Sequence, residues 1–584
     1  METTNLSKIR RDKMLKTLSE IKKNISDEET LNSLSLIENE LTKKKYGLIW
    51  EEHEERVDKE LETQIPTFEE IKDKEIICNP DEKFNFLLEG DNLHSLYLLE
   101  KTHKEKIDII YIDPPYNTGN DEFMYNDSYI DKEDNYRHSK WLSFMEKRLL
   151  IAKQLLKNDG LIFISIDDNE LYQLKLLCDN IFDESNFIAN IVIETANGVF
   201  GTRASQTRKT IVKVKDYVLV YAKNKNDISR EFTPLYMPTN DLFDPHYSIM
   251  LDDNYKRMNF VDFLKKEPFS IDKFSKYNLK ISVDNVSKLM KIDNDFNKYI
   301  LEMSDRIYQD VSFSLKISED IDKIISNGKV IKYKNSIIFK TKNGNGTVRQ
   351  YVPFKDSLRY TDDYNSEYRK AVAIGDLWEG FDADMKNVSK EGSCEFKNGK
   401  KPLRLIKQLI KWANIKNGTI LDFFAGSGTT AQSVLELNKE DGGNRNFILC
   451  TNNENKICED KTYSRIKNIT SKTPFNLKYY RCTYIPRINT ENENLHNNLL
   501  INIKNLIQLE NGIEIDDNKI KVYLDEEELD KFSTNKEELE VCEKVYISSD
   551  ILLTSEQEEI FENNNIEVYI IPEYYFEDEI KEVM

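Results

Sequence analysis

The sequence predicts an α/β protein whose mostly parallel, doubly wound sheet is divided by an inserted segment. Across residues 76–225, short β-branched apolar runs alternate with stretches of helical spacing. This alternation is lost from about 226 to 375 and resumes from 376. In both parts, one strand leads directly into a turn rich in proline or glycine. Open parallel sheets bind ligands at the carboxyl ends of their strands, so these turns are the candidate site.

The chain has 584 residues, enough for several domains. In its N-terminal part, Leu15, Leu18, Ile21 and Ile25 recur at helical spacing. We expect this arm to pack on its own chain or on a partner, with a direct role on DNA as the alternative. The predicted segments are a helical arm (1–75), a catalytic part of the sheet (76–225), an insertion (226–375), a cofactor-binding part of the sheet (376–488) and an acidic α+β interaction domain (489–584).

Individual elements follow from local patterns. Residues 141–157 have the spacing of an amphipathic helix, and Asn158-Asp159-Gly160 is typical of a helix C-terminus. The insertion has only short alternating segments and reads as irregular. Strands are predicted at 84–88, 107–112, 161–166, 419–424 and 447–451, and also at 520–524, 545–548 and 566–571 in the acidic segment.

The net charge of −21 is concentrated at one end of the chain. Residues 491–584 hold 26 acidic and 7 basic residues, a net charge of −19. The remainder holds 78 acidic and 76 basic residues, a net charge of −2. The remainder can therefore carry the basic faces that contact nucleic-acid phosphates, whereas the acidic segment should repel DNA.

The composition argues against secretion, membrane insertion and a zinc module. The seven cysteines are scattered without a Cys-x-x-Cys pair, and the six histidines show no metal-ligand spacing. We find no run of 18 apolar residues and no signal-peptide pattern at the N-terminus. We therefore expect a cytoplasmic protein with no metal site and no membrane association.

Asp113-Pro114-Pro115-Tyr116 follows the apolar strand predicted over 107–112. The prolines fix their own φ angles and make the turn stiff. The aspartate offers an anionic acceptor, and the tyrosine offers a flat face beside it. This combination suits a planar group with a donor edge, such as the exocyclic amine of a base.

A glycine-rich turn follows the strand predicted over 419–424. Glycine lets the backbone turn sharply and approach a ligand, and amides at the start of the next helix favour an anionic group. No Gly-Lys-Ser/Thr follows, which excludes a P-loop. The residues of this turn are Asp422, Phe424, Ala425, Gly426, Ser427, Gly428 and Thr429.

The two motifs together resemble amino-methylating DNA methyltransferases that use S-adenosylmethionine. The Asp-Pro-Pro-Tyr motif precedes the glycine-rich motif by about 300 residues, which is the circularly permuted order of the β group. The chain is most similar to the modification subunit of type III restriction–modification systems. Further similarity lies in the Lys45–His53 segment, in Gly90-Asp91-Asn92-Leu93 and in the helix from Trp141 to Arg148. The resemblance covers about residues 40–225 and 370–485.

The resemblance implies a role for each matching residue. Asp113 and the Pro114 carbonyl would accept hydrogen bonds from adenine N6, and Tyr116 would stack on the flipped base. Many relatives place an acid after the strand that follows the glycine-rich turn, where it binds the ribose. Here Glu454 is the nearest acid, which leaves that contact open. The implied cofactor residues are those of the glycine-rich turn with Glu454, Lys401 and Asp91.

Contacts with double-stranded DNA need a separate basic surface. Basic side chains with interleaved aromatic and amide groups suit phosphates and base edges, although a solvated basic face is the alternative. The candidates are Arg203, Arg208, Lys209 and Lys213 before the insertion, and Arg349 and Arg359 within it.

The sequence favours N6-adenine methylation by base flipping and direct attack. N4-cytosine enzymes more often carry serine at the position of Asp113, but N4-cytosine methylation and a stand-alone enzyme remain open. The third alternative is a DNA-recognition subunit that assembles with a nuclease. The resemblance implies a homodimer and a restriction (helicase–nuclease) subunit as partners.

Overall fold

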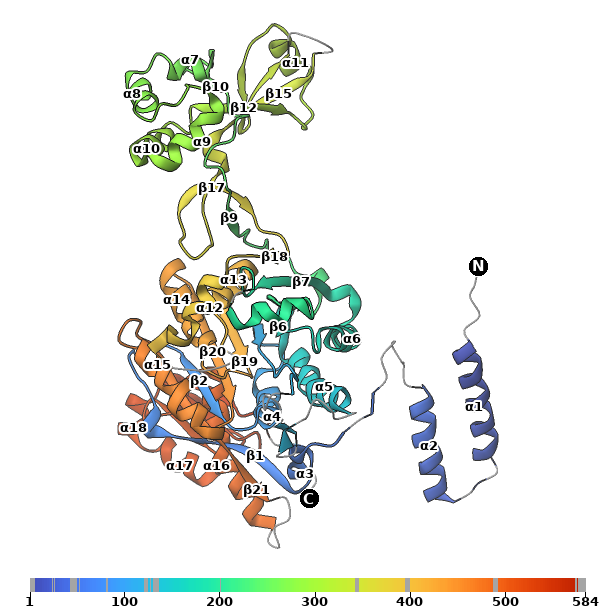
Figure 1. Cartoon of the computed structure of the whole chain (residues 1–584). Coiled ribbons are helices and arrows are strands. Elements are labelled where there is room, and N and C mark those ends of the chain that lie inside the picture. Colours follow the sequence, from blue (N-terminus) through green and yellow to red (C-terminus); the bar gives the residue numbers. More distant parts are fainter. Residues whose placement is uncertain are drawn as a thin grey trace.

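The computed structural model describes residues 6–23, 25, 27–42, 50–51, 53–79, 82–119, 124–125, 128–129, 136–199, 201–341, 346–393, 400–486, 492–572 and 575. A large body carries the insertion at one end, and a helical hairpin near the N-terminus lies apart from it (Figure 1). Most of the Lys45–His53 segment falls outside the described residues.

The body is built on a ten-stranded sheet in the order β1-β21-β2-β20-β19-β3-β6-β8-β7-β18. The run from β21 to β6 is parallel throughout, which confirms the predicted α/β class with a mostly parallel sheet. Its strands are β1 (Gln64–Glu70), β2 (Phe84–Glu89), β3 (Ile107–Ile112), β6 (Leu156–Ile166), β7 (Phe187–Glu194), β8 (Lys215–Ala222), β18 (Leu377–Trp378), β19 (Asn417–Asp422), β20 (Asn444–Thr451) and β21 (Asn476–Pro486).

Helices cover both faces of this sheet. Successive side chains of a strand point to opposite faces, so Ile110 and Ile112 of β3 join one core, and Ile109 and Tyr111 join the other. The first core is closed by α3 (Arg56–Thr63), α4 (Asn92–His103), α5 (Arg137–Leu155), α6 (Leu171–Phe182) and α16 (Asn492–Asn511). The second is closed by α13 (Leu403–Ala413), α14 (Thr429–Asp441) and α15 (Ser464–Ile469), and α12 (Asp382–Asn387) precedes α13.

The insertion is more regular than its composition suggested. It contains a six-stranded antiparallel sheet in the order β11-β10-β12-β15-β14-β13, and a small sheet β16-β17-β9 lies between it and the body (Figure 1). Short helices with buried Phe260, Phe274 and Phe296 pack beside the larger sheet. The strands are β9 (Tyr236–Pro238), β10 (Ile249–Leu251), β11 (Arg257–Asn259), β12 (Ile307–Ser312), β13 (Ile331–Tyr333), β14 (Ser336–Lys340), β15 (Val348–Pro353), β16 (Leu358–Tyr360) and β17 (Tyr368–Ala373). The helices are α7 (Phe260–Leu264), α8 (Pro268–Lys276), α9 (Val283–Ile292), α10 (Asn294–Glu302) and α11 (Glu319–Ser326).

The acidic segment alternates strands and helices. Its sheet β22-β23-β24 is parallel, so this segment is α/β and not the α+β arrangement that we expected. The elements are β22 (Ile520–Tyr523), α17 (Glu526–Ser533), α18 (Lys536–Val541), β23 (Lys544–Ile547), α19 (Ser555–Asn563) and β24 (Glu567–Ile570).

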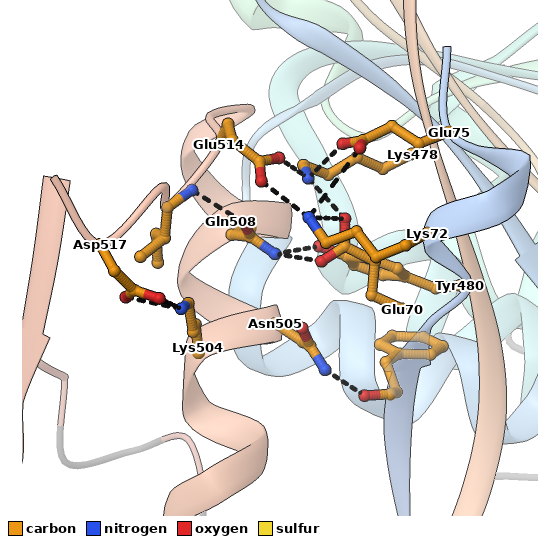
Figure 2. Close-up of polar contacts among 12 residues, drawn as sticks. Glu70, Lys72, Glu75, Lys478, Tyr480, Lys504, Asn505, Gln508, Glu514 and Asp517 are labelled. Carbon is orange, nitrogen blue, oxygen red and sulfur yellow. Dashed lines mark hydrogen bonds and ion pairs between the residues drawn. The ribbon is translucent and has the colours of Figure 1, made fainter. Parts of the chain in front are cut away.

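The start of the acidic segment is anchored on the main sheet. The Asn505 side chain donates to the Phe68 carbonyl at 2.6 Å, and Gln508 donates to the Tyr480 hydroxyl at 3.0 Å (Figure 2). The fully buried Lys478 pairs with Glu70, Glu75 and Glu514 in the same view. Buried apolar residues of α16 complete the core, so this helix belongs to the body.

Two local predictions were wrong. Residues 64–70 of the expected helical arm form the edge strand β1, where Pro66 is tolerated because an edge strand need not donate every N–H. Helix α5 ends at Leu155, and Gly160 lies inside β6 without the left-handed φ of a helix C-cap.

The remaining elements are α1 (Leu6–Lys22), α2 (Glu28–Thr42) and a small hairpin of β4 (Met124–Tyr125) and β5 (Ser128–Tyr129). Within the described residues, no helix is long and apolar enough to span a membrane.

Candidate active site

Four neighbouring strands deliver their loops to one edge of the sheet. β2, β20, β19 and β3 are adjacent and parallel, so their carboxyl ends meet there. Asp113 follows β3, the glycine-rich turn follows β19, and Asp91 follows β2. Both predicted motifs therefore lie at the same edge.

Lys401, which lies just before α13, reaches the turn after β3. Its Nζ lies 3.3 Å from the Asp113 carboxylate and 3.6 Å from Asp216. It also lies 4.5 Å from the centre of the Tyr116 ring, a cation–π contact. An ammonium thus lies beside both the acceptor and the flat face that the sequence predicted for an amine-bearing base.

The charges of this cluster are set by burial and by the neighbouring groups. Burial raises the pKa of the Asp113 carboxyl above its usual range, and the Lys401 ammonium opposes that shift. Burial lowers the pKa of Lys401, but Asp113 and Asp216 outweigh burial and leave it raised. Lys401 is therefore charged at neutral pH and favours the ionised form of Asp113.

Asp216 is a site residue that the sequence analysis did not assign. β8 runs antiparallel to β6, and Tyr217 pairs with Ile166, so β8 begins at the edge where β6 ends. That register carries Asp216 to the ligand-binding edge. In the sequence, Asp216 is a single acidic residue that follows a run of basic ones, and this was the one local sign of a functional role.

Hydrogen bonds hold the Asp-Pro-Pro-Tyr turn in place. Trp141 Nε1 donates to the Pro115 carbonyl at 2.7 Å. Asn117 takes a left-handed φ of 56° and donates to the buried Glu170 carboxyl at 2.5 Å. His138 Nδ1 lies 2.6 Å from the same Glu170 oxygen. Burial raises the pKa of Glu170 to about 8, against the stabilising bond from Asn117.

The glycine-rich turn is shaped around Asp422. Its buried carboxylate accepts from the Phe424 amide at 3.0 Å and from the Thr430 hydroxyl at 2.5 Å. Burial raises the pKa of Asp422 to about 7 despite these bonds. Gly426 and Gly428 have φ angles of 46° and 73°, a region that L side chains rarely adopt.

The two glycines differ in what surrounds them. A Cβ at Gly428 would lie 3.1 Å from the Thr462 side chain, which would have to shift by a few tenths of an ångström, so packing favours glycine here. A Cβ at Gly426 would find its nearest heavy atom, the Phe424 carbonyl oxygen, at 3.8 Å. The turn is thus open at Gly426, which leaves room for a ligand to approach its backbone.

The side chains of Ser427 and Thr429 point into the protein. Their hydroxyls lie 3.0 Å apart, and the buried Arg465 donates to both, at 3.1 and 2.7 Å. Phe424 is half-buried against Phe144, with ring centres 5.9 Å apart. Ala425 donates its amide to the Cys450 carbonyl at 3.1 Å, which ties the turn to β20.

Asp91 caps α4 by accepting from the Leu93 amide at 2.8 Å. The fully buried Arg148 lies 3.5 Å from it, donates to Asn92 at 2.6 Å and binds Glu55 through two bonds of 3.0 and 3.1 Å. Asn92 in turn donates to the Phe423 carbonyl at 2.9 Å. Arg148 therefore links the loop after β2 to the glycine-rich turn, a function that no local pattern predicted.

Glu454 is exposed in the short turn η7 (Glu454–Lys456). The predicted ribose contact stays a prediction. Nearby, Asn453 donates to Glu89 at 3.1 Å, and Glu89 also pairs with Arg481.

The predicted DNA-contacting residues fall into three environments. Arg208 and Lys209 are exposed beside η3 (Gly201–Arg208), which also contains Arg203, whose side chain lies outside the described set. Lys213 pairs with Asp167 at 2.6 Å and Asp216 at 3.2 Å, and Arg349 pairs with Asp310 at 2.7 Å. Arg359 is exposed on β16. The paired cations can contact phosphates only by exchanging or sharing their carboxylates.

The protein is thus an α/β protein whose sheet edge carries an anionic acceptor (Asp113), an aromatic face (Tyr116) and a glycine-rich turn that is open at Gly426. The model of a DNA methylase family matches residues 107–463, more than half of the chain. The chain belongs to this N6/N4 DNA methylase family.

Curated relatives include Mod subunits of type III restriction–modification enzymes. The chain is 33% identical to HindVI Mod of Haemophilus influenzae over 61% of its own length and 48% of the relative. It is 30% identical to EcoPI Mod of Escherichia phage P1 over 66% and 59%. It also matches the type II methyltransferase M.KpnI of Klebsiella pneumoniae, at 28% identity over 65% and 84%. The chain thus spans about half to three fifths of the two Mod subunits.

Solved structures give only weak overall likeness. A putative DNA modification methylase of Thermus thermophilus, complexed with S-adenosyl-L-methionine, is 11% identical, with a TM-score of 0.29 over 68% of this chain and 99% of that one. The cytosine-N4-specific PvuII DNA methyltransferase is 12% identical, with a TM-score of 0.28 over 68% and 96%.

Proposed function

We propose that the chain is a site-specific DNA methyltransferase that transfers a methyl group from S-adenosylmethionine to adenine N6, as the modification and recognition subunit of a type III restriction–modification system. The observation that carries the proposal is the cluster of Asp113, Tyr116 and Lys401. Family membership and the names of the Mod relatives support the reaction and the system. Double-stranded DNA is the proposed substrate, and the cytoplasm the proposed location.

The residues of the cluster suit an exocyclic amine. The N6 amine is a poor nucleophile because its lone pair is delocalised into the ring. The Asp113 carboxylate and the Pro114 carbonyl would accept its two hydrogens, which exposes the lone pair. Tyr116 would stack on the flipped base and offset part of the cost of unstacking, which is roughly a few kcal/mol. Lys401 must then move away from Asp113. Asp216, whose carboxylate lies 3.6 Å from the Lys401 ammonium, can remain its ion-pair partner.

The glycine-rich turn fits the proposed cofactor. Gly426 leaves its backbone open on one side, and the amides that begin α14 favour a carboxylate. We assign Phe424, Ala425, Gly426 and Gly428 to the walls of this site. Ser427 and Thr429 would contact the cofactor through their backbone atoms, because their side chains point into the protein. Asp91, Asp422, Lys401 and Glu454 complete the proposed set. S-adenosylmethionine supplies an activated methyl group when bound there.

DNA would be read by the insertion and held by basic residues near it. We propose that Arg203, Arg208, Lys209, Lys213, Arg349 and Arg359 contact DNA. A homodimer and a restriction subunit are the proposed protein partners. The acidic surface beyond α16 suits a protein better than DNA, because phosphates repel it.

Product analysis tests the reaction. The purified chain is incubated with duplex DNA and S-adenosylmethionine, and the DNA is digested to nucleosides and analysed by mass spectrometry. N6-methyladenine is the expected product. N4-methylcytosine would show the alternative specificity, and the absence of any methylated base would contradict the proposal.

A further inference from the structure

The helical hairpin of α1 and α2 leaves several large apolar side chains exposed. The two helices run antiparallel and lie apart from the body (Figure 1). They are joined by Lys22, whose Nζ donates to Ser35 at 2.9 Å and pairs with Glu38. Among the described side chains of this hairpin, only Leu18 is buried. An isolated pair of short helices gains little stability from such limited contact.

Three exposed apolar residues lie on one broad side of the hairpin. Met14 is 55% exposed, Ile21 43% and Ile37 48%. Successive residues of a helix are about 100° apart around its axis. On this basis, each of the three side chains lies roughly a quarter turn around its helix from the side that faces the other helix, and in the same direction of rotation. Because the helices are antiparallel, equal rotations bring these residues to the same side. We call Met14, Ile21 and Ile37 the hairpin face.

The two helices carry opposite charge. α1 has six basic and two acidic residues, and α2 has four acidic residues and no basic one. Residues 6–42 as a whole hold seven of each sign and are neutral. Such a hairpin is complementary to itself, and because it is neutral as a whole it lacks the net positive charge that favours DNA phosphates.

We propose that the hairpin face binds the same face of a second copy of this chain, forming a four-helix contact about a twofold axis. An axis parallel to the helices places α1 of one copy against α2 of the other, which matches their charges and covers the apolar side chains. The inference rests on the proposed homodimer and assigns the surface that forms it.

The mass of the full-length chain in solution tests the proposal. By light scattering during gel filtration, the wild type is expected at twice 68.7 kDa. The combined variant Met14→Glu, Ile21→Glu and Ile37→Glu is expected at 68.7 kDa, because charges would face each other in the contact. Leu36→Glu is the matched control, because Leu36 is 67% exposed on the side of α2 that points away from α1, about 100° from Ile37, and should leave the dimer intact.

A second variant tests the charge complementarity without placing charges on the apolar face. Lys13→Glu reverses the charge of an exposed residue of α1 at the edge of the hairpin face and should raise the dimer dissociation constant several-fold. An unchanged constant would contradict the pairing of α1 with α2.

The outcomes separate the surface from the homodimer and from catalysis. A monomeric wild type overturns both the homodimer and its surface. A dimeric wild type with a dimeric hairpin-face variant overturns the surface alone. A variant that stays dimeric but loses affinity for duplex DNA would show that the face binds DNA and would overturn the proposal. Methyl transfer is measured in parallel and bears only on the proposed reaction.

Discussion

Lys401 and Asp113 come from distant parts of the chain and meet at 3.3 Å across the candidate site. The same ammonium lies 4.5 Å from the centre of the Tyr116 ring. The Lys401 ammonium therefore contacts both groups that would bind the target base, the Asp113 carboxylate and the Tyr116 ring. In the proposed reaction, Lys401 keeps Asp113 ionised before the base arrives and is then displaced towards Asp216.

Replacing Lys401 by methionine should change the pH dependence of methyl transfer. The loss of the nearest cation raises the pKa of Asp113 further, so a higher pH is needed to ionise it. We expect the acidic limb of kcat/KM to move to higher pH, and Lys401→Arg to restore most of its position. Lys439→Met, on the exposed end of α14, is the control. An acidic limb that stays in place would exclude this electrostatic role.

The two glycines of the turn should respond differently to alanine. Gly428→Ala brings a Cβ within 3.1 Å of Thr462 at a φ of 73°, so we expect a loss of stability of about 1–2 kcal/mol or more. Gly426→Ala carries a similar backbone cost without the close contact, and its methyl group would enter the proposed ligand site. Calorimetric titration with S-adenosylmethionine should show the larger loss of affinity for Gly426→Ala. Equal affinities would argue against the cofactor assignment.

Glu170 should make stability depend on pH. Its pKa is raised from 4.5 to about 8, so folding takes up a proton between these values. The stabilising contribution is complete below pH 4.5 and is lost as the pH rises through 8. Glu170→Gln removes this dependence of stability on pH. The difference between the unfolding midpoints of the variant and the wild type should therefore shift in favour of the variant from about pH 5 to about pH 8.5. A constant difference, like that expected for the exposed Glu559→Gln, would contradict the raised pKa.

Arg148 should be much more important for stability than a surface cation. Arg148→Met leaves the buried Glu55 with only Lys147, 3.8 Å away, as a charge partner, and breaking a buried ion pair typically costs about 3–5 kcal/mol. The exposed pair of Lys531 and Glu527 gives the comparison, and Lys531→Met should cost less than about 1 kcal/mol. Chemical denaturation measures both. Similar small losses would show that the link from Glu55 to Asn92 contributes little.

Local patterns were sufficient for the strands that carry the two motifs. The apolar run Ile107–Ile112 is β3 as predicted, and the strand before the glycine-rich turn was placed within two residues of its end. Both strands are central and buried on two faces, so their composition alone reveals them. Pro66 obscured β1, because proline is compatible with a strand only at a sheet edge, which a sequence does not show.

The contacts around the site depend on tertiary neighbours and could not be read from spacing. Asp216 reaches Lys401 only because β8 reverses direction against β6. Arg148 joins Glu55 and Asn92, which are 93 and 56 residues away in the chain. The insertion was read as irregular because its helices and strands are short, and its largest core is formed by aromatic and aliphatic residues that come from several separate elements.

The central claim is that Asp113 accepts the amine that is methylated, and the single-turnover rate of methyl transfer to duplex DNA tests it most directly. We expect Asp113→Ala to bind S-adenosylmethionine like the wild type and to form N6-methyladenine at least about 100-fold more slowly, the effect typical of losing one preorganised polar group in an active site. Methyl transfer by Asp113→Ala at the wild-type rate would contradict the account.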